Sequence, residues 1–317
     1  MFFTANKRKS KSGCIRKTDA EMEPHAKCFC HLFGFPHTIR HTMTTFQAII
    51  YGIVHGFTQF LPLSSEAHHL LLPYFLDWPA VEGYFSGTLA LSAFLALLVY
   101  FRHDWASIIS GFLQVILLRK RPMTLDERLP FFIITISLPP AIAWYYFNER
   151  LAEIQWQPLL LAGVLVVIAI AFTFFDSFSR KNRGMSDWNW TDALILGVLQ
   201  ILAFVPGAGI QAGALIGSLS RNYNREAAGR FTCFVITPLL GASAFYQLRG
   251  FDFHAGMPAP DLSWLSLVTA FLVAFFSGLL AIGGFLRTFQ KRGLGTYATY
   301  RWLLAAAVGV VYWLRLS

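Results

Sequence analysis

Residues 55–69 place polar side chains of several chemical kinds inside an otherwise apolar stretch. Their sequence, HGFTQFLPLSSEAHH, contains three histidines, two serines, a threonine, a glutamine and a glutamate. Imidazoles titrate near neutral pH, and a serine hydroxyl becomes a nucleophile when an acid–base group stands beside it. If a helix follows Pro62, Ser65 and His68 lie three residues apart on one helical face. The pattern therefore predicts a hydroxyl nucleophile next to an acid–base residue.

Other polar groups of the same stretch are suited to holding a phosphate. His55 and Gln59 are four residues apart, so a helix would put a base beside an amide donor on one face. Thr58 and Ser64 add hydroxyls, and a helix that begins near Ser65 would point unpaired backbone N–H groups at an anion. Any one of these residues alone is as well explained by a hydrogen bond to a neighbouring carbonyl. Their density in one short apolar stretch favours a functional site.

The whole chain has the composition of a membrane protein. Of its 317 residues, 55% are hydrophobic and 14% are charged, and the mean hydropathy is +0.50. Soluble domains are far less apolar than this. No Ser/Gly-rich linker divides the chain, so we expect a single membrane domain from residue 43 to residue 317.

The net charge of +9 does not indicate nucleic-acid binding, because the basic residues gather in short connectors such as LLRKRPMTLDER and SRKNRGMSD. Membrane proteins carry Lys and Arg in this way in their cytoplasmic loops. The four cysteines predict no disulfide framework, and the CFCH at residues 28–31 lacks a second pair of metal ligands. The bilayer, and no nucleic acid, is therefore the expected partner, and nothing indicates an oligomeric state.

The apolar runs predict an all-α polytopic fold, since a helix needs about 20 mostly apolar residues to cross a bilayer. Six runs have that length or nearly so and predict about six full transmembrane helices: 82–101, 129–146, 157–176, 229–247, 263–286 and 299–315. Three more are short or interrupted: 46–76, 105–118 and 191–220. The motifs LPLSSEAHH and VPGAGIQAG break the first and the last of these three. Bent backbone at membrane depth is tolerated inside protein or a wet cavity, so we expect two re-entrant helical hairpins.

The two broken runs resemble each other. AIIYGIVHGFTQFLP and ALILGVLQILAFVP each have a Gly four residues after the first Ala, then a polar residue, His55 or Gln200, and a closing Pro. Such similarity indicates an inverted repeat whose broken helices meet near the midplane, with repeat 1 at about 43–176 and repeat 2 at about 190–317. Chance similarity between two apolar segments is the alternative.

Residues 1–42 form a basic N-terminal extension without the apolar core of a signal peptide. Two interpretations fit it. The reading frame is over-extended and the protein starts at Met43, or the extension is a genuine cytoplasmic arm. In the first case the basic connectors 119–128 and 177–190 lie in the cytoplasm and both chain ends lie outside, whereas the second case inverts this topology.

One motif resembles that of a known family. The pattern G-x-x-x-G-x-x-x-F-L-P-x-S-S-x-x-H is formed by Gly52, Gly56, Phe60, Leu61, Pro62, Ser64, Ser65 and His68. It resembles the undecaprenyl-diphosphatase family, the bacitracin-resistance phosphatases of bacterial inner membranes. Further segments are similar in the same order, among them YFRHDW, ITISLPPAIAWYYF, PLLGASAF and FFSGLLAIGGFLRTFQKRGLGTYATYRWLL. The resemblance covers nearly everything after Met43.

This resemblance implies a multi-pass protein of the bacterial inner membrane, with a periplasm-facing pocket between two re-entrant loops. The pocket would remove the terminal phosphate of a C55 polyprenyl diphosphate, which yields the monophosphate carrier reused for peptidoglycan. We expect catalysis from Ser65, His68 and His55. Substrate binding is expected from a second set of residues: Ser64, Gln59, Thr58, Gly207, Gly209 and Gln211.

The chain departs from the family pattern at charged positions. His55 and Gln59 stand where family members carry two glutamates, and Ile210 of PGAGIQAG stands where the family motif P-G-x-S-R-S-G has its catalytic arginine. The divalent cation that the family implies thereby loses its carboxylates, so we predict no metal ligand. A protonated His55 is the best substitute cation. The arginines after the second motif are interpreted as cytoplasmic loop charges: Arg221, Arg225 and Arg230.

Two functions follow from these features. The retained S-S-x-x-H favours an undecaprenyl-diphosphate phosphatase with degenerate catalytic motifs. The missing arginine and carboxylates favour a protein of the same fold that binds or translocates a polyprenyl phosphate without hydrolysing it. Both predict a polyprenyl phosphate as ligand.

Overall fold

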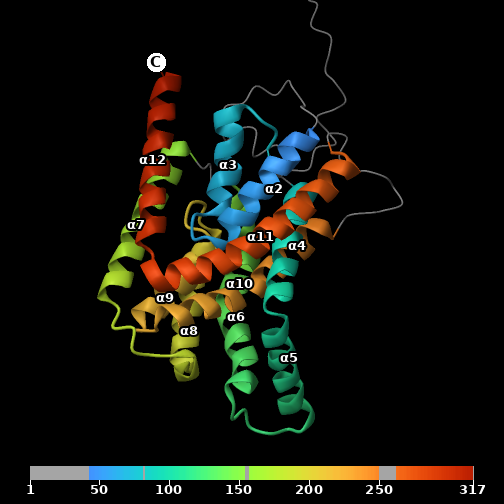
Figure 1. Ribbon diagram of the computed structural model, residues 1–317, viewed down its shortest axis with the longest axis vertical. Helices are drawn as coiled ribbons and strands as arrows, with labels where there is room; N and C mark the ends of the chain where they lie inside the picture. Colours follow the sequence, from blue (N-terminus) through green and yellow to red (C-terminus); the bar gives the residue numbers. More distant parts are fainter. Residues whose placement is uncertain (1–42, 81–82, 154–156, 250–261, 317) are drawn as a thin grey trace, which may run out of the picture.

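The computed structural model describes residues 43–80, 83–153, 157–249 and 262–316 (Figure 1). Within these ranges the chain is helical and contains no β-strand, as predicted. The α-helices are α2 (Thr45–Phe60), α3 (Ser65–Leu76), α4 (Gly83–Tyr100), α5 (Arg102–Leu117), α6 (Leu125–Glu153), α7 (Pro158–Phe178), α8 (Trp190–Leu199), α9 (Ala212–Ser220), α10 (Arg225–Leu248), α11 (Trp264–Arg292) and α12 (Gly295–Leu316). Two short 3₁₀ helices are η1 (Met185–Asp187) and η2 (Gln200–Phe204). The N-terminal extension predicted at 1–42 lies outside the described residues.

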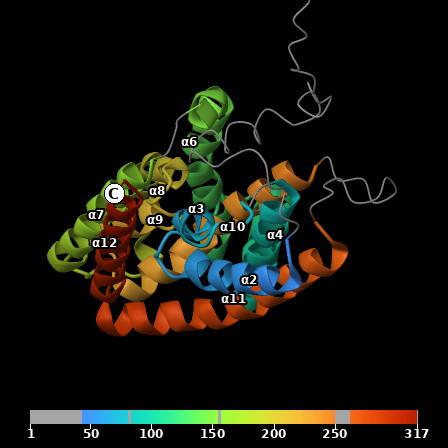
Figure 2. The ribbon, with the colours of Figure 1, turned by 90° about the horizontal axis from the view of Figure 1, so that it is seen from above.

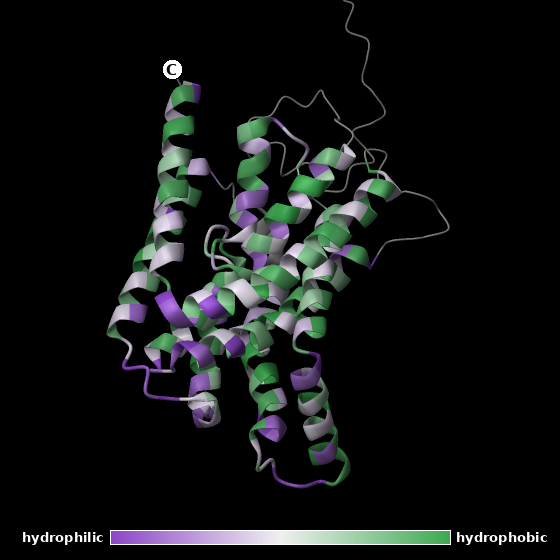
Figure 3. Cartoon of the chain, viewed as in Figure 1, coloured by the Kyte–Doolittle hydropathy of each residue, from purple (hydrophilic) through white to green (hydrophobic). Residues whose placement is uncertain are grey.

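Five of the described helices are long and apolar enough to cross a membrane: α4, α6, α7, α10 and α11. They correspond to five of the six predicted spans. The sixth predicted span, 299–315, forms α12, whose 22 residues give a length of about 33 Å. Arg301 and Arg315 lie within the apolar part of α12, which is therefore not among these five helices. Many large apolar side chains of these helices are exposed, and hydrophobic residues predominate along the helices in Figure 3, so the chain is a multi-pass membrane protein.

The interrupted run 46–76 forms two antiparallel helices, α2 and α3. A capping box starts α2, in which Thr44 and Gln47 each accept the other's backbone N–H through their side chains. The helix ends at Phe60, because the ring of Pro62 disfavours helical backbone in the preceding residue, which is extended. The chain then turns through residues 61–64, which we call the first hinge.

The run 191–220 repeats this arrangement. Here α8 tightens into η2, ends just before Pro206, and the chain returns as α9. We call residues 205–211, between η2 and α9, the second hinge. In Figure 1, α2 and α3 occupy the upper half of the molecule and α8 and α9 the lower half, with the two hinges between them. The remaining short run, 105–118, forms the single helix α5.

Each of these helix pairs packs against a helix from the other half of the chain. α2 lies along α11 (Figure 2), where a Cβ added to Gly56 would be 2.7 Å from the carbonyl oxygen of Ala274. α8 packs on α6, where a Cβ at Gly197 would be 3.0 Å from Cγ of Pro139. Small residues permit such close approach between helices in a membrane. This crosswise packing holds both hinges near the centre of the bundle.

The connectors at the lower end of the molecule in Figure 1 are tied together by buried charges. Asp192, fully buried at the start of α8, accepts hydrogen bonds from Arg183 and Arg221 of two different connectors and from Tyr223. Burial, together with the Asp192 carboxylate, raises the pKa of the Tyr223 phenol, so this hydroxyl remains the donor. The basic connectors therefore share one side of the molecule, as expected of cytoplasmic loops.

Candidate active site

Two successive pairs of polar side chains join α2 to α3 beside the first hinge. The Ser65 hydroxyl donates a hydrogen bond to the side-chain oxygen of Gln59 at 2.6 Å. One helical turn further, Nδ1 of His55 lies 3.1 Å from Nε2 of His69, and the two rings stack with centroids 5.0 Å apart. The structure thus brings His55 and Gln59 onto one face of α2, as their spacing predicts. Ser65, Gln59 and His55 are buried, and His69 is half-buried.

The ring of His68 is fixed by partners on both of its nitrogens. Its Nδ1 lies 2.8 Å from the carbonyl oxygen of Ser64, and a carbonyl oxygen only accepts, so Nδ1 carries the proton. Its Nε2 then holds the lone pair and accepts from the hydroxyl of Tyr300 on α12 at 2.7 Å. Ser65 and His68 share α3, but the hydroxyl of Ser65 bonds Gln59 while the ring of His68 bonds Tyr300. Ser65 and His68 therefore do not bond each other as expected; each has a different side-chain partner.

Ser64 occupies the most strained position of the first hinge. Its φ of 72° is rare for a residue with a side chain, and such backbone strain clusters at active sites. Its hydroxyl caps α3 by accepting from the N–H of Ala67 at 3.3 Å and lies 3.5 Å from a carboxylate oxygen of Glu66. Thr58, by contrast, donates to the carbonyl of Val54 in its own helix. The Ser64 hydroxyl therefore lies at the N-terminus of α3, whereas the Thr58 hydroxyl has an acceptor inside α2.

The second hinge lies directly against the first. Gly207 and Gly209 have φ values of +93° and +86°, which glycine adopts without strain. A Cβ at Gly209 would be only 3.2 Å from Cα of Ser64. Gln211 donates from its side chain to the backbone carbonyl of Gln59 at 2.6 Å. The predicted residues of the two hinges are thus brought together, although about 150 residues of chain separate them.

A buried arginine, Arg301 of α12, joins the two hinges. Its Nε donates to the carbonyl of Pro62 in the first hinge at 2.8 Å. Its two Nη atoms donate to the carbonyls of Gly207 and Ala208 in the second hinge, each at 2.7 Å. The apolar run 299–315 predicts a membrane span, and this prediction did not identify Arg301 as a site residue. The signal that would find it is a charged side chain inside an apolar run, which indicates a functional site.

The other arginines considered as substitutes lie away from the hinges and have carboxylate partners. Arg221 pairs with Asp192, as described, and Arg225 with Asp176 at 2.9 Å. Arg230 pairs with Asp104 at 2.6 Å. The three arginines lie just before α10 or in its first turns, on the side where the basic connectors gather. Their positions and ion pairs agree with the interpretation of these arginines as connector charges.

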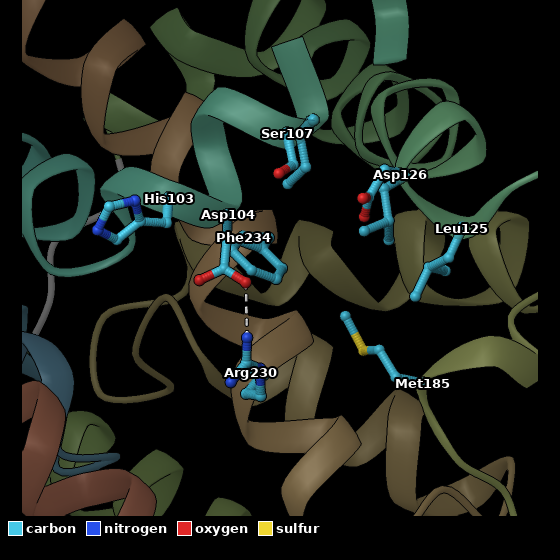
Figure 4. A pocket seen from close by; sticks show the side chains of 10 residues that line it. His103, Asp104, Ser107, Leu125, Asp126, Met185, Arg230 and Phe234 are labelled. Carbon is cyan, nitrogen blue, oxygen red and sulfur yellow. Dashed lines mark hydrogen bonds and ion pairs between the residues drawn. The ribbon is translucent and has the colours of Figure 1, made fainter. Parts of the chain in front are cut away.

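Arg230 and Asp104 also line a cavity of about 230 Å³ between α5, α6 and α10 (Figure 4). Asp126 adds a second carboxylate to its wall, so the one arginine faces two acidic side chains. Such a cavity repels a diphosphate, which carries several negative charges. We therefore place the candidate active site at the two hinges.

The side chains at the hinges do not match the divalent cation that the family resemblance implies. Hard cations bind several carboxylate or carbonyl oxygens. In the described part of the chain, no three His, Cys, Asp or Glu side chains are grouped so as to hold a metal ion. The ring nitrogens of His55 and His69 point at each other. The donor set therefore does not fit such a cation.

These features define a class of protein: a polytopic helical membrane protein with two polar hinges around a buried arginine. The comparison with known families identifies the class further. The family model for the bacitracin resistance protein BacA matches residues 48–307, and the chain belongs to this family.

Curated relatives agree with this assignment. The chain is 32% identical to the undecaprenyl-diphosphatase of Moorella thermoacetica over 274 residues, which cover 86% of this chain and 100% of the relative. It is 34% identical to the undecaprenyl-diphosphatase of Geotalea daltonii over 260 residues, 82% of this chain and 95% of that relative. The resemblance inferred from the motifs is thus confirmed.

Proposed function

We propose that this protein is an undecaprenyl-diphosphate phosphatase. It uses water to cleave the terminal phosphate from a C55 polyprenyl diphosphate, releasing inorganic phosphate and the monophosphate carrier reused for peptidoglycan. The observation that carries this proposal is the meeting of two polar hinges around Arg301 in a chain of the BacA family. A diphosphate needs cations and N–H donors in a water-poor site, and apolar helix faces accommodate a lipid tail.

In this proposal Ser65 is the nucleophile and His68 is the acid–base group. The Ser65 oxygen attacks the terminal phosphorus, and the bond between that phosphorus and the bridging oxygen breaks, so that the monophosphate lipid leaves. Water then hydrolyses the phosphoserine and releases inorganic phosphate. Gln59 orients the Ser65 hydroxyl, and Nε2 of His68 takes up the proton that the reaction moves when it exchanges the Tyr300 hydroxyl for the reacting group. His55 lies one helical turn from Gln59 on α2. Its hydrogen bond with His69 holds a proton that the two rings can exchange with the site.

The remaining predicted residues are proposed to hold the phosphates. Ser64 offers its hydroxyl and the N-terminus of α3, while Gln59 and Gln211 offer amides. Gly207 and Gly209 let the second hinge approach the anion closely. Thr58 contributes least, because its hydroxyl already bonds Val54.

The finer architecture is also a proposal. α2 with α3 and α8 with α9 would be re-entrant hairpins of an inverted repeat, which is supported by their similar sequences, their proline hinges and their crosswise packing on α11 and α6. Location in the bacterial inner membrane, with the site open to the periplasm, is supported by the basic connectors on the opposite side.

Phosphate release from C55 diphosphate by the purified protein tests the function. We expect turnover in the native protein and a loss of at least about 100-fold in Ser65→Ala, as for removal of a catalytic nucleophile. Ser218→Ala is the matched control, because its buried hydroxyl only bonds the Ala214 carbonyl in α9. Release by Ser65→Ala at the native rate would refute the role of Ser65, and no release by the native protein would refute the phosphatase.

The same assay with a chelator tests the proposed independence from metal. We expect the rate to stay within about twofold after EDTA treatment, because the hinges lack a carboxylate set for a hard cation. Complete loss of activity that returns with Mg²⁺ or Ca²⁺ would show that a cation binds there after all.

A further inference from the structure

We propose that Arg301 of α12 is the cation that binds the diphosphate, in addition to holding the two hinges together. This inference rests on the proposed function for the identity of the site. It assigns the positive charge of the site to a helix that belongs to neither hinge.

The burial of Arg301 is the first observation. Its side chain is 0% exposed, and its partners are three neutral backbone carbonyls. Among the described residues no carboxylate forms an ion pair with it. Two lysines and five other arginines do form such pairs: Lys120, Lys181, Arg183, Arg221, Arg225, Arg230 and Arg315. The carboxyl group of Glu66 acts on the Arg301 charge only through space, without an ion pair, and a buried charge compensated in this way favours a ligand that is an anion.

The donor capacity of Arg301 is the second observation. A guanidinium has five N–H donors, and the three hydrogen bonds to the hinge carbonyls use one donor on each nitrogen. Each Nη therefore keeps one further N–H. N–H groups of a guanidinium are strong donors to phosphate oxygens, so these two remain for the ligand.

The position of Arg301 relative to the hinges is the third observation. A Cβ at Gly209 would be 3.3 Å from Nη2 of Arg301 and 3.4 Å from Cβ of Ser64, so these three residues converge. Ile210 follows directly, at the position where a hinge arginine is absent. The cation that the second hinge lacks is thus supplied from α12, on the side of the hinge that faces Ser64.

Binding of inorganic diphosphate, measured as the rise in thermal unfolding temperature of the detergent-solubilised protein, tests this without turnover. We expect the native protein to be stabilised by diphosphate and Arg301→Gln to lose that stabilisation, while Arg301→Lys keeps part of it because it keeps the charge. Arg315→Gln on the same helix is the control, since this exposed side chain lies only 3.5 Å from Asp77 and far along α12 from the hinges. Equal stabilisation of the native protein and Arg301→Gln would overturn the proposal.

A second pair of variants leaves Arg301 in place, in case its replacement prevents folding. Ile210→Glu sets a negative charge in the second hinge, and Ile210→Gln is its neutral match. We expect Glu to abolish the diphosphate effect and to raise the KM for lipid diphosphate by about tenfold or more, and Gln to change neither strongly. Equal behaviour of the two variants would overturn the proposal. A native protein that binds diphosphate but releases no phosphate would instead refute the phosphatase and leave the cation assignment standing.

Discussion

The roles of the hinge residues depend on which atom each side chain reaches. His68 illustrates this, because its Nδ1 is committed to the Ser64 carbonyl and its Nε2 is left to accept from Tyr300. The ring also stacks on Tyr300, with an interplanar angle of 16°. Tyr300 thus positions the ring of His68, the proposed acid–base group, without belonging to either hinge. Its neighbour Arg301 positions the backbone of both hinges through hydrogen bonds to their carbonyl oxygens.

Replacing Tyr300 tests this positioning role. In Tyr300→Phe the stacked ring remains but the hydrogen bond to Nε2 of His68 is lost, and one such bond contributes about 0.5–1.5 kcal/mol. We expect kcat for phosphate release to fall by about three- to tenfold with little change in KM.

Tyr312→Phe is the control for this experiment, because Tyr312 lies on the same helix, is half-buried and is three turns away from the hinges. An equal fall in kcat for both variants would indicate a general effect on α12. An unchanged kcat in Tyr300→Phe would remove Tyr300 from the site.

At the scale of elements, the contact between α2 and α11 determines where Gln59 and His55 lie. Gly52 and Gly56 allow it: a Cβ at Gly56 would be 2.0 Å from the Ser277 hydroxyl oxygen, and one at Gly52 would be 2.9 Å from the Ala270 carbonyl. The neighbouring backbone cannot move aside without shifting α11. The glycines of the family motif thus have a packing function in this chain.

We expect Gly56→Ala to lower the free energy of unfolding by about 1–3 kcal/mol, as overpacking of a close contact does, and to reduce phosphate release by displacing Gln59. Thermal unfolding and the release assay measure the two effects. Gly284→Ala on α11 is the matched control, since its Cβ would meet nothing within 4 Å. The prediction fails if Gly56→Ala is as stable as Gly284→Ala.

At the scale of the whole molecule, the buried carboxylates Asp192 and Asp176 gather the basic connectors on one side. Asp176, at the end of α7, accepts from Arg225 at the start of α10 and from the backbone N–H of Leu294 before α12. The end of α7 and the starts of α10 and α12 are thereby joined at the same side of the bundle. Asp77, at the end of α3, lies on the side of the C-terminal end of α12, where it meets Arg315.

Cysteine labelling in intact cells tests the proposed orientation of these two sides. In a background without the four native cysteines, we expect Asp77→Cys to react with a membrane-impermeant reagent from outside. Asn182→Cys, in the exposed connector between α7 and α8, should react only after permeabilisation. The reverse pattern would invert the topology and support a cytoplasmic arm at residues 1–42.

The amino-acid sequence by itself determined the class, the helices and the hinges. Apolar runs of sufficient length must become helices in a bilayer, because no other structure satisfies their backbone there. The prolines after Phe60 and Phe204 end those helices, and the polar residues around them form the proposed site. These are local properties, so Ser64, Ser65, His55 and Gln211 were predictable from their own surroundings.

Tertiary structure alone decided which groups meet. Arg301 contacts Pro62 across 239 residues of chain, and Tyr300 reaches His68 across 232. Neither contact leaves a periodicity or a spacing in the sequence, because both depend on how α12 packs against the two hinges. The charge that is missing at Ile210 therefore had to be sought in space, where a buried side chain from the last helix supplies it.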